Sequence, residues 1–368
     1  MIIRIISLVL FFIAWTLFVG CNENKQKTFD KNPFSVIDNN YDYQTIKYNH
    51  VEKLITENEI KNARQVENGF LSIGFFDFIQ INPDTAFIFS AREEKIFQLA
   101  DSAGVLKKTT IAQQGNGPDQ IQKGIRFYIL DEEIYLIQRF RVSELEKRDE
   151  SGSYSLHVKR TIPLYVNFYE ELDDESALVV NTYTFKNETS FQKVSADFKS
   201  IEKEIGGYIE SESPNLNKSF NFNAVISTKS QTMYAQVFNF LPYVGLFNKE
   251  LELKKVYYLE NFIPSQIELS GEYEDDFKRD NARLHTSLAN LLPLNDNRIW
   301  LAFSDNQSIR VGPSEFDNRL VRKLYHYFII ESDMTMKHVG SSEYNGVLFN
   351  NRFLFIKDDH LHITDEIF

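Results

Sequence analysis

Two histidines near the C-terminal end of the sequence are its densest group of potential metal ligands. His360 and His362 are separated by one residue, with aspartates close by at positions 358, 359 and 365. Residues two positions apart on a β-strand project from the same face, so both imidazoles could reach one metal ion. A solvated last strand has the same composition and needs no metal. We therefore predict no metal or other cofactor here.

Two acidic segments, residues 170–175 and 272–276, could bind a hard cation. The first lacks the regular oxygen-ligand spacing and the glycine of a calcium loop, and a solvated turn explains its charge. The sequence also contains no Gly-x-Ser-x-Gly elbow, His-Glu-x-x-His helix or dinucleotide fingerprint. The sequence therefore leaves any catalytic residues unknown, and carboxylates from distant parts of the chain could still meet in the fold.

The only cysteine, Cys21, stands at the end of an apolar leader. The apolar run at 5–19 is short for a membrane span and typical of a signal-peptide core. With small Gly20 before the cysteine, the segment resembles a bacterial lipobox, although Phe18 is bulkier than usual at its place. We predict a lipoprotein signal peptide at 1–20, cleavage before Cys21 and acylation of that cysteine by fatty acids such as palmitate. A stray buried thiol or an uncleaved transmembrane anchor is the alternative.

Several acyl chains on Cys21 would hold the mature protein at a membrane without a transmembrane helix. Asn22 follows the cysteine, in place of the aspartate associated with inner-membrane retention, so we expect the outer membrane of the cell envelope rather than the inner one. Whether the protein faces the periplasm or the outside is left open. Residues 21–40 are expected to be a flexible tether to one folded domain at 41–368.

Composition narrows the function further. The formal net charge is -12, without a basic stripe, so nucleic acid is not an expected partner. Hydrophobic residues make up 43% of the chain and aromatic residues 14%, which favours a strand-rich globular domain. With Cys21 acylated, no disulfide can form, so packing alone must stabilise the fold. We expect a monomer.

A polar turn followed by a short apolar run occurs six times. From Phe87 to Leu354 the spacing averages about 53 residues, which fits a four-stranded propeller blade. We therefore predict an all-β fold, a six-bladed β-propeller of four-stranded blades. An irregular β-sandwich is the alternative. The six runs cover residues 86–89, 134–137, 177–180, 233–237, 299–303 and 353–356.

The last predicted blade is one strand short, because only residues 361–363 continue the pattern after its second strand. We predict that an N-terminal strand closes this blade, supplied by 43–48 or 51–55, since this would pair an edge that is otherwise open.

Two segments between the apolar runs are longer than the four-stranded repeat requires. Residues 260–290 lead into a possible helix at 281–292, and residues 304–318 form the second segment. Long loops on a rigid ring are where partner contacts usually occur, so we expect contacts there, or else simple surface decoration.

One local motif reads IAQQGNGPDQI. Its Gly115, Gly117 and Pro118 match the Gly-x-Gly-Pro-x-Glu-Phe signature of the six-bladed β-propeller lipoproteins, a TolB-like and NHL-like family of bacterial envelope proteins that this segment resembles. Gln120 replaces the usual Glu, and Ile121 the usual aromatic residue. The glycines permit close backbone approach and Pro118 restricts a turn, so we interpret the motif as structural. The resemblance implies the fold and an envelope location, and no catalytic residues.

The predicted fold is a rigid ring that presents loops, and the sequence contains no recognisable catalytic motif. We therefore predict a non-enzymatic binding or scaffold module for an envelope protein, peptide or glycan. The alternative is a hydrolase or lyase at the mouth of the central channel. That reading requires acidic, His, Tyr or Arg side chains to converge at one end of the axis. A sensory role is a third possibility, which fold analogy alone cannot support.

Overall fold

The described part of the chain consists mostly of β-strands. Within it, no helix is long and apolar enough to cross a lipid bilayer. The computed structural model describes residues 32–37, 40–48, 53–71, 76–102, 105–115, 120–121, 125–130, 133–138, 141–147, 154–162, 166–172, 175–181, 191–209, 221, 223–263, 267–269, 277–279, 285–310 and 318–366.

Four of the sheets share one plan, in which four consecutive strands pair antiparallel in sequence order. Three have these strands alone, and the fourth gains β1 as a fifth strand. The three are β7 (Ile125–Leu130), β8 (Glu133–Gln138), β9 (Arg141–Lys147) and β10 (Tyr154–Thr161); β11 (Val166–Glu171), β12 (Ala177–Asn181), β13 (Phe191–Val194) and β14 (Ile201–Glu204); and β21 (His285–Pro293), β22 (Ile299–Arg310), β23 (Asn318–Ile330) and β24 (Met336–Ser342). The fourth contains β1 (Asp42–Ile46), β15 (Asn223–Ser227), β16 (Met233–Phe238), β17 (Tyr243–Asn248) and β18 (Leu253–Leu259).

An eight-stranded sheet combines two such antiparallel groups. The groups meet where β2 runs parallel to β6, through the residue pair Glu67 and Lys107. One group is β3 (Phe76–Asn82), β4 (Thr85–Ser90), β5 (Lys95–Ser102) and β6 (Val105–Gln113), and the other is β25 (Gly346–Phe349), β26 (Arg352–Lys357), β27 (His360–Glu366) and β2 (Arg64–Phe70). The remaining elements are the short strands β19 (Ile267–Leu269) and β20 (Phe277–Arg279), the 3-10 helix η1 (Pro33–Val36) and the helix α2 (Glu57–Asn62).

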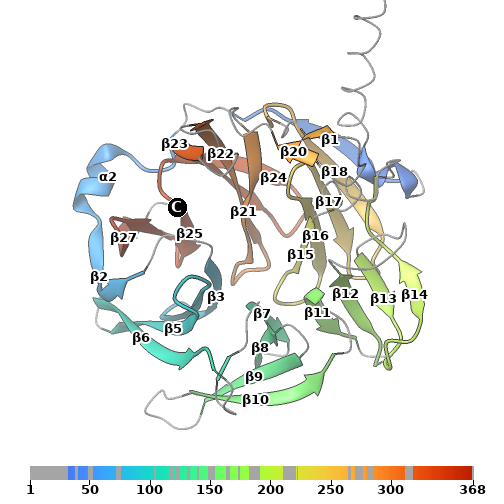
Figure 1. The fold of residues 1–368 in the computed structure, drawn as a ribbon, viewed down its shortest axis with the longest axis horizontal. Helices are drawn as coiled ribbons and strands as arrows, with labels where there is room; N and C mark the ends of the chain where they lie inside the picture. The colour runs from blue at the N-terminus through green and yellow to red at the C-terminus, as the bar shows by residue number, and fades with distance from the viewer. Residues whose placement is uncertain are drawn as a thin grey trace, which may run out of the picture.

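The sheets stand around a common centre as a propeller (Figure 1). The first strands of the groups lie innermost, where β3 contacts β7 and β21, while β15 contacts β11 and β21. The predicted all-β propeller is therefore confirmed. The described strands do not form six separate four-stranded sheets. Hydrogen bonding gives four sheets of four or five strands, joins the first and last strand groups into one eight-stranded sheet, and leaves β19 and β20 as a two-stranded sheet.

Each of the six apolar runs forms the second strand of a group, in β4, β8, β12, β16, β22 or β26. β16 is buried at every position, and β4 at every position after Thr85. Neighbouring sheets cover both faces of these strands, so alternation between polar and apolar residues is lost. The hydrophobic core therefore lies between the sheets, as when Phe303 of β22 packs in one cluster with Val237 of β16.

The N-terminal part of the chain runs along the outer edges of successive sheets. We call residues 32–37, 40–48 and 53–70 the strap. β1 pairs in parallel with β18, Lys53 forms a parallel bridge to Ser341 of β24, and β2 pairs antiparallel with β27. The strap therefore supplies the outer strand of the last group, and that strand is β2.

The proposed closing segments 43–48 and 51–55 were wrong. The first contributes to β1, which pairs with β18, and residues 53–55 lie against β24. The predicted helix at 281–292 was also wrong, because residues 285–293 form β21, an innermost strand paired with β22. In the predicted loop at 304–318, the strands β22 and β23 extend to Arg310 and from Asn318, and residues 311–317 lie outside the described chain.

The strap begins with a buried anchor. Phe34 of η1 is fully buried, and its ring centroid lies 5.7 Å from that of Phe238. A Cβ on Gly207 or Gly245 would come within 2.7 Å of the Phe34 ring, so both glycines make room for it. Residues 32–37 thus belong to the folded domain, although they fall inside the predicted tether.

Candidate functional site

The glycine-proline motif forms a backbone contact at the end of β6. The Gly115 N–H donates to the Ile121 carbonyl (3.1 Å), and the Ile121 N–H donates to the Gln113 carbonyl (3.1 Å). The Ile121 side chain is buried between sheets. Gly117, Pro118 and the predicted lipidation residue Cys21 lie outside the described residues.

The histidines of β27 do not converge on a shared ligand site. His360 Nδ1 lies 2.9 Å from the Asp358 carbonyl oxygen, while the His362 ring stacks on Phe355 with centroids 5.6 Å apart. Burial lowers the pKa of His362 from its usual value. Among the described residues, no group of three or more His, Cys, Asp or Glu side chains could hold a metal ion. The acidic segment 272–276 lies outside the described part.

In the other acidic segment, residues 170–175, the neighbouring residues Glu170 and Glu171 lie in different environments. Glu170 is fully buried on β11, where the Tyr234 hydroxyl donates to its Oε1 (2.6 Å). Burial raises the pKa of Glu170 to about 7. Glu171 instead points to the surface and pairs with Arg160 at 3.1 Å. Among the described residues of this segment, 170–172 and 175, Glu170 is therefore the one buried carboxyl group.

Lys229 occupies one end of the ring, in the turn between β15 and β16. Its ammonium donates to the main-chain oxygen of Gln80 at the end of β3 and to Asn295 Oδ1 just after β21. Burial lowers the pKa of Lys229 to about 8. Since β3, β15 and β21 belong to three strand groups, this lysine ties them together. It contacts oxygen acceptors, not an acid–base partner suited to catalysis.

A buried row of polar side chains crosses the sheet of β21 to β24. His326 Nε2 lies 2.9 Å from Asp305 Oδ2, and His326 Nδ1 lies 2.7 Å from Ser341 Oγ. The Thr286 hydroxyl donates to Asp305 Oδ1 (2.6 Å). Tyr48 of the strap covers the row, its ring 4.9 Å from that of His326. His326 is 0% exposed and Ser341 3%, so this Ser-His-Asp set is closed to substrates and acts as a structural network.

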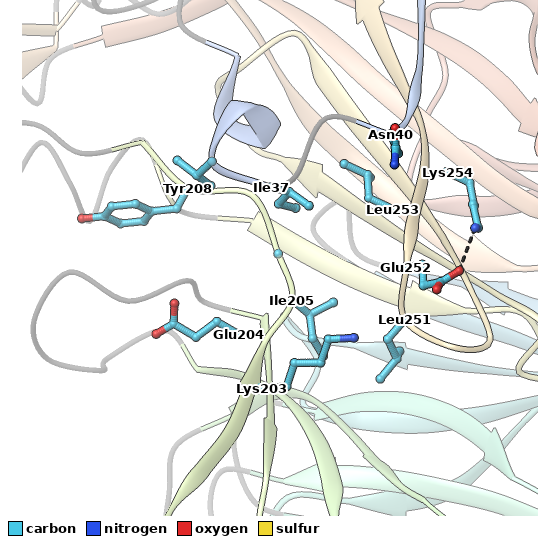
Figure 2. Close-up of a pocket in the computed structure, with 12 residues that line it drawn as sticks. Ile37, Asn40, Lys203, Glu204, Ile205, Tyr208, Leu251, Glu252, Leu253 and Lys254 are labelled. Carbon is cyan, nitrogen blue, oxygen red and sulfur yellow. Dashed lines mark ion pairs between the residues drawn. The ribbon is translucent and has the colours of Figure 1, made fainter.

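A surface groove of about 630 Å³ lies between β14 and the turn that leads into β18. The strap forms its third side (Figure 2). β14 is the last strand of its sheet, and all four of its residues are exposed. The groove therefore runs beside a strand edge. It is lined by Val36, Ile37, Asn40, Lys203, Glu204, Ile205, Gly206, Tyr208, Leu251, Glu252, Leu253 and Lys254.

The groove sets charged side chains of both signs between apolar walls. Figure 2 shows Lys203 directed toward the side formed by Leu251, and Glu204 directed away from it. Across the groove, Lys254 pairs with Glu252 at 2.7 Å. The pKa of Glu252 is lowered, first by its hydrogen bond with Lys254 and further by the charge of Lys203. The groove lining contains two lysines, Lys203 and Lys254, and two glutamates, Glu204 and Glu252.

Sequence reasoning missed the groove, Lys229 and the His326 row. Each assembles residues from segments that are far apart in the chain, so neither local motif nor spacing indicates them. The one local signal was the polar turn at 228–231, which precedes the apolar run at 233–237 and by itself indicates only a hairpin.

Comparison with known proteins supports the fold and no more. No protein-family profile matches the sequence, and no curated protein is similar to it. The chain is similar to a Bacteroides fragilis protein thought to be exported, with a TM-score of 0.51 and 10% identity, over 87% of this chain and 98% of that one. It is also similar to a member of the duf4221 family from Bacteroides vulgatus, with a TM-score of 0.48 and 9% identity, over 82% and 94%. At 10% identity, the likeness to the Bacteroides fragilis protein shows a shared fold alone.

Proposed function

We propose that this protein is a lipid-anchored envelope protein whose propeller binds a partner non-enzymatically in the groove beside β14. The groove, in which charged side chains stand between apolar walls, carries the proposal. Binding proteins combine apolar walls with a few placed polar groups in this way. An envelope protein or peptide is the favoured partner, because strand edges recognise polypeptide main chain.

The anchor and the groove would lie on the same part of the molecule. Cys21 precedes Asn32, the first described strap residue, by eleven positions, a reach of at most about 40 Å. Acylated Cys21 would therefore hold the edge of the β14 sheet near the membrane, preferentially the outer membrane. A partner in the groove would be bound close to the lipid surface.

We also propose that the ring has six blades. The eight-stranded sheet contains two antiparallel groups of four strands, and they meet through one parallel residue pair. We expect these groups to behave as two blades, with the last blade closed by β2. Together with the four sheets of four or five strands they would make a six-bladed ring of the TolB-like kind.

The enzyme alternative finds less support. At the end of the ring where Lys229 lies, the described contacts join it to main-chain and amide oxygens. The Ser-His-Asp set is buried beneath Tyr48. Neither place brings an accessible acid–base pair together among the described residues.

Two experiments test the proposal. Labelling with an alkyne fatty acid should mark the wild-type protein and fail to mark Cys21→Ala, which should also leave the membrane fraction. Affinity purification from solubilised envelopes should recover a partner with wild type and with Lys61→Glu on the distant helix α2, and lose it with Lys203→Glu. If wild type, Lys61→Glu and Lys203→Glu all recover the same proteins, a binding role for the groove is contradicted.

A further inference from the structure

The first part of the strap presents large hydrophobic side chains to the outside. Among the described residues six such side chains are exposed, and two of them belong to this part of the strap: Val36, at 61%, and Tyr43, at 48%. Tyr43 lies in β1, which Figure 1 shows at the outer rim of the ring, away from its centre. One exposed apolar residue is ordinary on a protein surface, so the neighbours of these two decide what they mean.

Tyrosine side chains connect Val36 with Tyr43. Asn32 caps η1, the helix that contains Val36, and its Nδ2 donates to the Tyr41 hydroxyl (3.1 Å). The pKa of Tyr43 is raised, first by burial of part of its side chain and further by the nearby hydroxyls of Tyr258 and Tyr41. One apolar and three aromatic side chains therefore gather at this part of the rim. We call Val36, Tyr41, Tyr43 and Tyr258 the rim patch.

η1 holds Val36 in its outward position. Phe34 of the same helix is fully buried, and its carbonyl accepts the Ile37 N–H (3.0 Å). The Pro33 carbonyl accepts the Tyr208 N–H (2.7 Å), which ties the helix to the neighbouring sheet. Val36 thus projects from a preformed surface, and little conformational entropy is lost when that surface makes a contact.

The lysines beside the rim patch have acidic partners within the protein. Lys47, just after β1, lies 3.7 Å from Glu260, and Lys254, across the groove from Val36, lies 2.7 Å from Glu252. The formal net charge of -12 also opposes adsorption to anionic lipid. Apolar and tyrosine side chains are instead suited to a membrane interface, where one end of a tyrosine is apolar and the other is wet.

The proposed acyl anchor would bring a membrane to this part of the rim. Cys21 precedes Asn32 by eleven positions, and Val36 follows only four residues later. The connecting chain spans at most about 40 Å, so the acylated protein is confined near the lipid by its strap end. Under that confinement the lipid is at a high effective concentration, and a few apolar contacts suffice for docking.

We propose that the rim patch docks on the lipid surface of the membrane that holds Cys21. Val36 inserts at the boundary of headgroups and acyl chains, and the three tyrosines lie at the level of the headgroups. The ring then stands with its rim on the membrane, and both ends of the ring face water. This inference rests on the acyl anchor of the proposed function and not on partner binding in the groove.

The test uses the mature chain, residues 21–368, with one hexadecyl chain coupled to Cys21 through a maleimide. Cys21 is the only cysteine, so the coupling is selective. The chain is bound to vesicles of phosphatidylcholine, either unmodified or brominated on the acyl chains, since bromine quenches tryptophan fluorescence on contact. Trp300 is the only tryptophan of the mature chain and is 0% exposed, so a tryptophan introduced at the rim reports lipid contact.

Val36→Trp should lose at least about half of its added fluorescence in brominated vesicles, because its side chain reaches the acyl boundary. Val158→Trp is the matched control, since Val158 is also exposed, at 48%, on β10 at another part of the rim (Figure 1). Its fluorescence should be the same in both vesicles. High salt should not reverse the quenching, because the contact is apolar. Equal quenching at both positions, or none at position 36 of the vesicle-bound chain, would overturn the proposal.

A second arm measures how much the rim patch adds to membrane retention. A single acyl chain holds a protein weakly and reversibly, so transfer of the hexadecyl-linked chain between vesicles is sensitive to any further contact. Val36→Asp combined with Tyr43→Asp should speed this transfer at least about tenfold, since it places two charges at the interface. Val158→Asp should transfer at the wild-type rate. Equal rates for wild type and the double variant would show that the rim patch does not touch lipid.

Other outcomes separate docking from its alternatives. If a second copy of the chain covers the rim patch, sedimentation without lipid will show a dimer that the double aspartate variant dissociates, and quenching at position 36 will be absent. Failure of fatty-acid labelling in cells would refute the anchor and docking together. Labelling of Cys21 without quenching at position 36 would refute docking alone. Unchanged recovery of partners by Lys203→Glu would refute groove binding and leave docking standing.

Discussion

Individual buried polar residues determine how this ring responds to pH. Glu170 is buried against Tyr234, and its raised pKa means that the folded protein holds a proton that the unfolded chain releases. Between about pH 4.5 and pH 7 the unfolded state therefore binds fewer protons, and the free energy of unfolding falls as pH rises. Above pH 7 both states are ionised at this group, and the dependence ends.

Glu170→Gln should remove this dependence, because the amide oxygen still accepts the Tyr234 hydrogen bond and does not titrate. Relative to the variant, wild type should lose about 2 kcal/mol of stability between pH 5 and pH 8. Urea denaturation at both pH values measures the difference. Parallel changes in the two proteins would show that Glu170 is not the responsible group.

Phe34 is the residue that fastens the start of the strap. Phe34→Ala should cost about 3 to 4 kcal/mol, because it leaves a cavity beside Gly207 and Gly245. Val36→Ala is the matched control from the same helix, since Val36 is 61% exposed and should change stability by less than about 0.5 kcal/mol. Thermal denaturation of both variants measures this, and similar losses would argue against a buried anchor.

At the scale of elements, the strap depends on close approach to β24. Gly340 has φ +135, and a Cβ there would lie 2.6 Å from the Leu54 Cα. This glycine is required for both its backbone conformation and the space it leaves. The strap is therefore fitted to the sheet edge through backbone contact, in keeping with the Leu54 hydrogen bond to Ser341.

Gly340→Ala should displace the strap near Leu54 and lower stability by about 1 to 3 kcal/mol. Limited proteolysis should then cut the strap between residues 53 and 62 faster than in wild type. Lys337→Ala, an exposed change on the same strand, should leave the cleavage rate unaltered. If both variants are cut equally, the strap does not rely on the contact at Gly340.

At the scale of the whole molecule, the apolar runs predicted the second strand of every group because burial on both faces leaves a local signal. Phe87 and Phe353 were placed correctly for this reason. The closing strand was assigned to the wrong residues, since β2 pairs with β27 across almost the whole chain and polar Arg64 and Gln65 give no sign of it. Residues 285–293 were predicted as part of a helix, and tertiary packing against β22 makes them a strand instead.

The candidate site was less predictable than the fold. Lys203 stands in an ordinary charged stretch, and only the chain path brings it opposite Leu251 and the strap. His326 and Asp305 likewise meet through the register of β22 and β23. Long-range pairing of this kind is absent from a single sequence, so the groove could be found only from the structure.

In-cell photo-cross-linking from position 201 on β14 tests the central claim most directly. A photoreactive residue there should form a discrete adduct with one partner, which disappears with Lys203→Glu. The same photoreactive residue at position 61 of α2 should not form it. Identical adducts from both positions, unaffected by Lys203→Glu, would contradict a membrane-held propeller that binds its partner in this groove.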